Sequence, residues 1–193
     1  MPMWNGCRQG RLRHIARLEA RAASERTRMA SAVSEIGAKP VLVLGCGNIL
    51  FGDDGFGPAV IEYLHSSGNL PKTVCAINAG TSVREILFDL ILSERRPETV
   101  IIVDAMDKGR QPGVLFRPSI DDVPVKKMDD FSMHQLPTSN LLRELRDLCG
   151  VEVVLLVCQV QSIPDSVSPG LSPVVQQAVT HAADSIIAEC GGE

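Results

Sequence analysis

The 193-residue chain has few aromatic side chains and no long apolar run. Aromatic residues make up 4% of the sequence, so the core of the protein must consist mainly of aliphatic side chains. The longest apolar run, from Val151 to Val160, is interrupted by Glu152 and Gln159 and is shorter than the ~18 residues of a membrane-spanning helix. We therefore expect a soluble protein that has no membrane partner.

Several common catalytic and redox motifs are also missing. The six cysteines show no C-x-x-C spacing, and a chain of this length does not need disulfides to fold, so we expect a reducing, cytoplasmic location. The sequence has neither the G-x-S-x-G motif of serine hydrolases nor the H-E-x-x-H motif of zinc proteases, and no cysteine and histidine share a local motif. A serine, cysteine or ordinary zinc-protease mechanism therefore has no support.

Charge is unevenly distributed along the chain. Residues 1–39 carry eight Lys or Arg against three Glu, whereas residues 40–193 carry 11 basic against 20 acidic side chains. An acidic body disfavours nucleic acid as a partner. We expect residues 1–38 to form a basic, poorly ordered extension and residues 39–193 to form one α/β domain. A transit peptide, or a weak amphipathic helix that contacts a membrane or RNA, remains an alternative for the extension.

Short apolar runs bounded by turn residues alternate with segments of helical period. This alternation is typical of a three-layer α/β/α fold with a mostly parallel, twisted sheet of about five strands. Helices are expected around the apolar stripes of residues 56–64, 83–90, 141–148 and 175–186, with Ser172 as the N-cap of the last helix. Strands are expected at residues 41–44, 73–77, 99–103, 114–116 and 151–160, the fourth of them at an edge of the sheet.

The loop after the first strand, from Gly45 to Gly55, is rich in glycine but differs from a dinucleotide-binding loop. The G-x-G-x-x-G fingerprint requires a glycine where this chain has Leu50. Asp53 and Asp54 also stand where a bound phosphate would need positive potential. Because carboxylates repel phosphate and attract cations, a divalent metal is the better candidate ligand for this loop.

Three residues are candidates for a shared catalytic and metal site. The loops at the carboxyl ends of the strands form the binding crevice of a parallel α/β sheet, and Asp54 and Asp104 follow the first and third expected strands. His134 lies in a loop before a helix. Two carboxylates and an imidazole suit nickel, zinc or a similar divalent ion. Each residue also has a simpler interpretation, as a cap or turn residue for the aspartates and as a solvated loop residue for the histidine.

Several short motifs follow one another along the chain: Gly45-x-Gly47-Asn48, Asp53-Asp54-x-x-Gly57, Gly80-Thr81, Val103-Asp104-Ala105, Pro112-Gly113 and His134-Gln135-Leu136. With these motifs, the chain resembles the maturation endopeptidases of nickel-iron hydrogenases from about Val41 to the last helix. The stretch from Gly80 to Gln159 is most similar to the peptidase that serves the deazaflavin-reducing hydrogenase of methanogens.

The resemblance implies an endopeptidase that removes the C-terminal extension of a hydrogenase large-subunit precursor after nickel insertion. The two acids that contact the metal in the family fall on Asp54 and Asp104, and its histidine falls on His134. Nickel would then belong to the precursor, so the free enzyme need not bind it tightly. The family often has Glu in place of Asp54 and an acid in place of Asn78. A non-catalytic assembly chaperone and a nucleotide- or nucleoside-binding α/β enzyme remain alternative functions.

Overall fold

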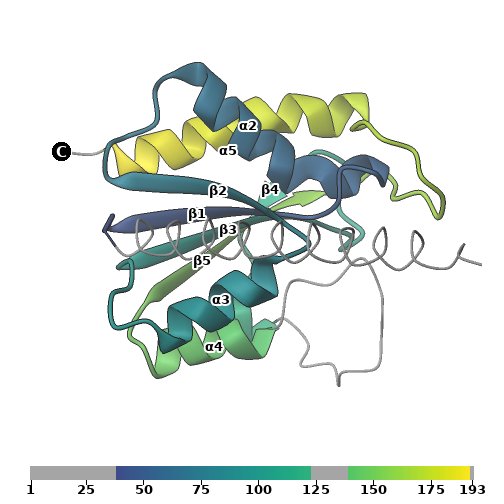
Figure 1. Cartoon of the computed structure of the whole chain (residues 1–193). Coiled ribbons are helices and arrows are strands. Elements are labelled where there is room, and N and C mark those ends of the chain that lie inside the picture. The colour runs from purple at the N-terminus through teal and green to yellow at the C-terminus, as the bar shows by residue number, and fades with distance from the viewer. Residues whose placement is uncertain (1–37, 123–138, 192–193) are drawn as a thin grey trace, which may run out of the picture. The chain divides into compact units, whose positions relative to one another are not determined.

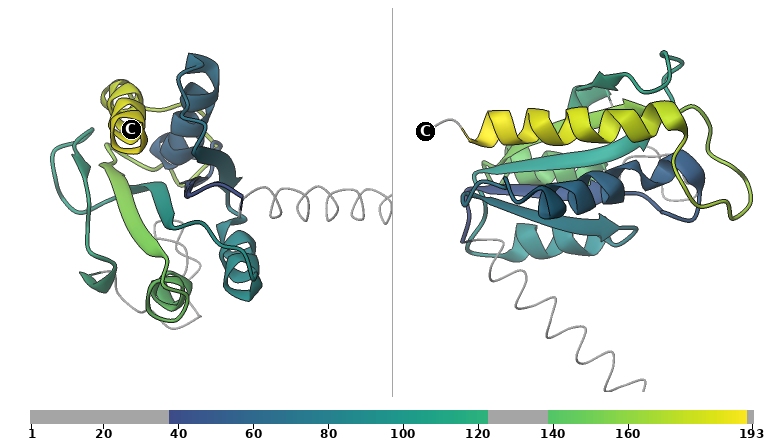
Figure 2. Two further views of the ribbon diagram at one scale, coloured as in Figure 1. Left: turned by 90° about the vertical axis from the view of Figure 1, so that its left-hand side faces the viewer. Right: turned by 90° about the horizontal axis from the view of Figure 1, so that it is seen from above.

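The computed structural model describes residues 38–122 and 139–191, which form a five-stranded sheet with helices on both faces (Figure 1). The helices α2 and α5 cover one face and α3 and α4 cover the other (Figure 2). This arrangement confirms the predicted three-layer fold. The elements are β1 Val41–Cys46, η1 Gly52–Gly55, α2 Phe56–Ser67, β2 Val74–Gly80, α3 Val83–Leu92, β3 Thr99–Met106, β4 Leu115–Phe116, η2 Ile120–Asp122, α4 Ser139–Asp147, β5 Glu152–Gln159 and α5 Pro173–Cys190.

The strand order is β2-β1-β3-β5-β4, and every neighbouring pair is parallel except β4 and β5. Val43 of β1 pairs with Ala76 of β2 on one side and with Ile101 of β3 on the other. The chain therefore leaves β1 in one direction, to β2, and then returns past β1 to β3. Such a reversal of strand order opens a crevice at the carboxyl ends of the two central strands, where α/β proteins bind their ligands.

The core is aliphatic, as the low aromatic content predicts. Its largest fully buried side chains are mainly leucines and isoleucines, and Phe56 is the aromatic residue among them. The predicted inward face of α5 is confirmed, because Val175, Ala178, Ala182 and Ile186 are all buried. In the described residues, no helix has the length and apolar character that a membrane crossing requires. The prediction for residues 1–38 lies almost wholly outside the described residues and stays a prediction.

The predicted element boundaries and contacts need four corrections. The strand β2 continues to Gly80, and β3 continues to Met106, so Asp104 lies inside a strand and not after it. Leu148, expected on the buried face of its helix, is 80% exposed because α4 ends at Asp147. Ser172 precedes α5 at the N-cap position, but its side chain makes no cap hydrogen bond.

The start of α2 lies directly against the ends of β1 and β3. A Cβ atom on Gly57 would lie 2.3 Å from the carbonyl oxygen of Cys46 and 2.4 Å from that of Val103. Real Cβ atoms do not come that close to backbone oxygens. The glycine therefore lets the helix begin in contact with both strands, and this contact places the preceding turn over the crevice.

Replacing Gly57 with alanine should lower the free energy of unfolding by roughly 1–3 kcal/mol, because backbone has to move to admit the methyl group. Urea unfolding followed by circular dichroism measures the loss. Glu62→Ala, at an exposed position of the same helix, is the control and should change stability by less than ~0.5 kcal/mol. Equal stability of the two variants would show that α2 does not depend on this contact.

Candidate functional site

The structure brings Asp54 and Asp104, two of the three predicted site residues, together at the carboxyl end of the sheet. Asp54 lies in η1, which follows β1, and Asp104 lies near the end of the adjacent strand β3. Each residue is only 6% exposed. The two carboxylates are close enough for the charge of Asp54 to raise the pKa of Asp104. The crevice at the reversal of strand order therefore contains a buried acid pair.

Asp54 is held by the loop that precedes it. Its Oδ2 atom accepts a hydrogen bond of 2.8 Å from the backbone N–H of Asn48, and the Asn48 side chain accepts one of 3.0 Å from the N–H of Leu50. The N-cap positions of η1 and α2 are Phe51 and Gly55. Asp54 is therefore not the cap of either helix, so its interpretation as a cap is wrong, whereas its place in the first turn of η1 agrees with the interpretation as a turn residue.

The carboxyl group of Asp104 is a weaker acid than that of an ordinary aspartate. Burial raises the pKa of its carboxyl group from 3.8 to about 7; the hydrogen bond from the N–H of Ala105 opposes this rise, and the negative charge of Asp54 adds to it. The Ala105 bond is 2.8 Å long and reaches Oδ1. A group with this pKa holds or releases a proton near neutral pH, which is the property that acid–base catalysis needs. It also loses its proton readily when a cation binds beside it.

Cys46 borders the acid pair, which sequence reasoning did not foresee. It ends β1, is 1% exposed, and donates a hydrogen bond from its thiol to the carbonyl of Leu44. Burial raises the pKa of this thiol well above its usual value of 9.0, and the charge of Asp104 raises it further. A thiolate is the reactive form of cysteine. Cys46 therefore stays a neutral thiol and is a poor nucleophile.

Asp53 has a different role from its neighbour Asp54. Its carboxylate is 1% exposed and accepts hydrogen bonds from the N–H groups of Gln161, Ser162 and Ser172, as well as from the Ser172 hydroxyl. These donors lie more than 100 residues away in the chain. Sequence reasoning had no signal for this contact, since a polar loop residue such as Ser172 shows no periodicity. Asp53 therefore connects the η1 turn to the segment between β5 and α5.

His134 lies outside the described residues, so its place beside the two acids stays a prediction. Residues 38–122 and 139–191 contain no group of three or more His, Cys, Asp or Glu side chains that could hold a metal ion. The two carboxylates can supply oxygen ligands. Nickel, zinc and similar ions bind such ligands when an imidazole nitrogen completes the coordination. A cavity of about 670 Å³ lies against the loop after β1, at Ile49 and Gly55, but neither Asp54 nor Asp104 lines it.

Comparison with known proteins assigns the chain to a family. The sequence profile of the hydrogenase maturation proteases matches residues 58–189. A protein of Methanocaldococcus jannaschii whose name describes a hydrogenase maturation protease is 39% identical over 153 residues, which cover 78% of this chain and 96% of the relative. The chain belongs to the hydrogenase maturation protease family. The predicted resemblance is confirmed.

Two further relatives are similar to this chain, one in sequence and one in both sequence and fold. The coenzyme F420 hydrogenase subunit delta of Methanothermobacter thermautotrophicus is 36% identical over 155 residues, which cover 78% of this chain and 94% of the relative. The solved structure of the hydrogenase maturating endopeptidase HybD from Escherichia coli matches this chain with a TM-score of 0.57 at 30% identity, over 78% of this chain and 91% of that one. The α/β fold is thus one that other members of the family have.

Asp104→Asn in this hydrogenase maturation protease should make stability less dependent on pH. A carboxyl group whose pKa is higher in the folded than in the unfolded state stabilises the fold below pH ~4, and this contribution is lost as the pH rises through about 7. The variant should therefore match the wild type near pH 4 and exceed it at pH 8, by at most about 4 kcal/mol.

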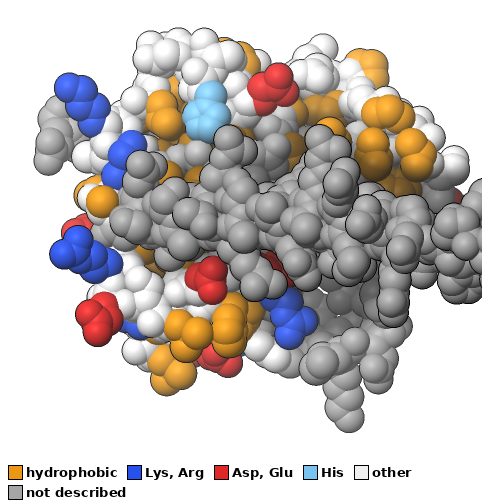
Figure 3. Space-filling model, viewed as in Figure 1, with side chains coloured by type: hydrophobic (Ala, Val, Ile, Leu, Met, Phe, Trp, Pro, Cys, Tyr) orange, Lys and Arg blue, Asp and Glu red, His pale blue; other side chains and the backbone are white. Residues whose placement is uncertain are grey.

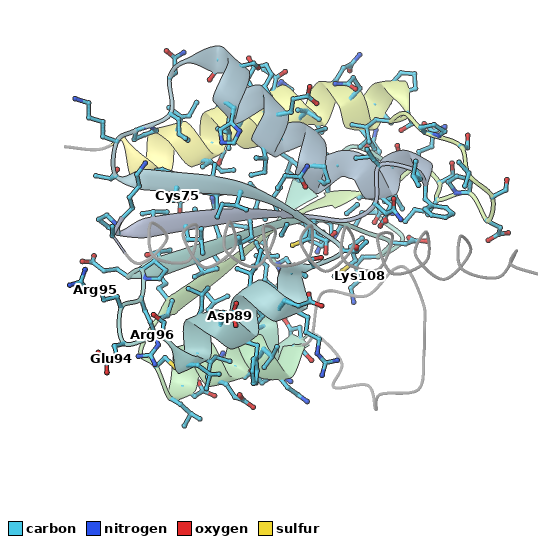
Figure 4. All side chains as sticks on the ribbon, in the orientation of Figure 1. Cys75, Asp89, Glu94, Arg95, Arg96 and Lys108 are labelled. Carbon is cyan, nitrogen blue, oxygen red and sulfur yellow. The ribbon has the colours of Figure 1, made fainter. Side chains whose placement is uncertain are left out.

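Urea unfolding at both pH values, in the presence of a chelator, measures this difference. Asp89→Asn, an exposed position on α3 (Figure 4), is the control and should show no such divergence. Destabilisation of the Asp104 variant by the same amount at pH 4 and pH 8 would contradict the raised pKa.

Proposed function

We propose that the protein is an endopeptidase that removes the C-terminal extension of a hydrogenase large-subunit precursor after nickel insertion. The observation that carries this proposal is the buried pair of Asp54 and Asp104 at the carboxyl end of the sheet, in a chain that belongs to the hydrogenase maturation protease family. The similarity to the coenzyme F420 hydrogenase subunit delta supports the precursor of a deazaflavin-reducing hydrogenase as the substrate. A cytoplasmic location agrees with this role and stays a prediction.

Nickel is part of the substrate in this proposal, and Asp54, Asp104 and His134 recognise it. A cation that approaches the acid pair relieves the repulsion between the carboxylates and favours the ionised form of Asp104. A precursor without nickel leaves Asp104 protonated and gains no attraction to the acid pair. The acid pair therefore favours precursors that already contain the metal.

The chemistry of peptide cleavage divides between the metal and the protein. Nickel supplied by the precursor acts as a Lewis acid that polarises the scissile carbonyl or activates a water molecule. In the metal-free site the pKa of Asp104 is about 7, so this carboxyl group loses its proton readily when the precursor's cation approaches. The raised pKa values of the buried thiols of Cys46 and Cys158 argue against a cysteine nucleophile.

Purified protein should shorten the nickel-loaded precursor and leave the nickel-free precursor uncut, as measured by gel electrophoresis and mass spectrometry. Asp104→Asn and His134→Ala should each lower kcat/KM at least ~100-fold, because each removes a ligand of the precursor's metal. Both variants should stay folded, since neither change deletes apolar core volume.

Asp89→Asn is the matched control for charge and should cleave at the wild-type rate. Normal cleavage by Asp104→Asn would rule out the proposed mechanism. A wild-type protein that binds the nickel-loaded precursor but never shortens it would instead indicate an assembly chaperone.

A further inference from the structure

The buried carboxylate of Asp53 connects the segment between β5 and α5, residues 160–172, to the turn that carries Asp54. Its Oδ2 atom accepts hydrogen bonds from the N–H of Gln161 (2.8 Å), the N–H of Ser162 (3.2 Å) and the hydroxyl of Ser172 (3.0 Å). Its Oδ1 atom accepts a fourth, from the N–H of Ser172 (2.7 Å). Both ends of the segment are therefore attached to one side chain, while residues 165–170 between them are exposed.

Backbone pairing attaches the middle of the same segment to the loop after β1. The N–H of Ser168 donates to the carbonyl of Leu50 at 2.8 Å, and the N–H of Gly52 donates to the carbonyl of Ser168 at 2.9 Å. Phe51 and Ser168 form a parallel bridge. Because the two segments run in the same direction, Val167 falls in register beside Leu50.

This pairing places two exposed apolar residues, Leu50 and Val167, side by side, and Ile49 precedes Leu50 in the same loop. Ile49 is 60% exposed, Leu50 is 44% exposed and Val167 is 65% exposed. Figure 3 shows hydrophobic side chains gathered at the end of the molecule where the turn before α2 and the segment before α5 lie. Two hydrogen bonds connect this surface to the site, one from the N–H of Leu50 to Asn48 and one from the N–H of Asn48 to Asp54.

We propose that Asp53 is a positioning residue, and that it holds Ile49, Leu50 and Val167 together as a docking rim for an apolar, extended segment of the precursor near its cleavage site. This inference rests on the proposed function. The occupant is apolar because the rim side chains are apolar and the stretch from Ser166 to Gly170 carries no charge. Two of the rim residues belong to the loop that holds Asp54 through the N–H of Asn48, so a peptide on the rim contacts the loop that positions the acid pair.

Asp53 matters for docking because only a carboxylate satisfies all four donors. An asparagine at this position has one acceptor oxygen, and its NH₂ group must then face either the N–H of Ser172 or the donors on the other side. The segment from Gln161 to Ser172 would lose an attachment, and Val167 would no longer be fixed beside Leu50. Asp54 keeps its own hydrogen bond from Asn48, so the acid pair itself does not depend on this attachment.

The test separates binding from chemistry. Val167→Ser should raise the KM for nickel-loaded precursor about tenfold and leave kcat within about twofold, because a rim contact acts on binding and not on the chemical step. Val167→Ile, which stays apolar, should keep the wild-type KM. Leu148→Ser is the matched control, since Leu148 is 80% exposed at the end of α4 and should affect neither constant.

Asp53→Asn should also raise KM more than it lowers kcat, and its thermal midpoint should fall below that of the wild type. Ser172→Ala removes one of the four donors and should give a smaller change in the same direction. If Asp53→Asn does not fold, the Val167 variants decide the question. A purely structural role for Asp53 would lower the thermal midpoint and leave KM unchanged.

Calorimetry of nickel-free precursor binding to the protein tests the docking rim without any cleavage step. The dissociation constant should rise about tenfold with Val167→Ser and stay unchanged with Leu148→Ser. A wild-type protein that binds precursor but cuts none would refute the proposed function, and this comparison would still test the rim. Val167→Ser that cleaves with an unchanged KM and dissociation constant would contradict the docking rim. A wild-type dimer, seen by light scattering, that Val167→Ser dissociates without a change in KM would contradict it as well.

Discussion

The contact between the backbone of Gly57 and the carbonyl groups of Cys46 and Val103 is the constraint on which the site depends. It removes the layer of side chains that normally separates a helix from a sheet and places the turn before α2 directly over the ends of β1 and β3. Gly47 serves the same purpose, because a Cβ atom there would lie 1.9 Å from the carbonyl oxygen of Asp54. Gly47 and Gly57 therefore both admit neighbouring backbone that a side chain would displace.

The turn uses its two consecutive aspartates in opposite ways. Asp53 accepts four hydrogen bonds, which offset the cost of burying its charge and fix a distant loop. Asp54 lies beside Asp104, where its charge raises the pKa of its neighbour. Asp53 therefore positions a distant segment, whereas Asp54 is held by the N–H of Asn48 in its own loop.

Local pattern was enough to predict the layers, the edge strand β4 and the meeting of Asp54 with Asp104. The alternation of apolar runs and helical stripes indicates the fold, and the carboxyl ends of parallel strands must share one edge. The pattern did not predict features that depend on contacts between segments far apart in the chain. The strand β3 passes through Asp104 because Ala105 and Met106 continue to pair with Cys158 and Gln159, although aspartate disfavours strands. Likewise, no local signal shows that Ser172 binds Asp53 and leaves its helix without a side-chain cap.

The raised pKa of Asp104 gives a physical reason why such a site would discriminate between precursors. A fully ionised acid pair would attract cations from solution, whereas a carboxyl group that is about half protonated near pH 7 keeps the net charge of the pair lower. Loss of that last proton near pH 7 costs little free energy, because the pKa and the pH almost coincide. In the proposed function, a cation fixed in a bound precursor would complete the ionisation of Asp104 and interact with both charges, whereas an unloaded precursor would leave Asp104 largely protonated and gain no such interaction. Burial of the acid pair would then contribute to selectivity for the finished metal centre.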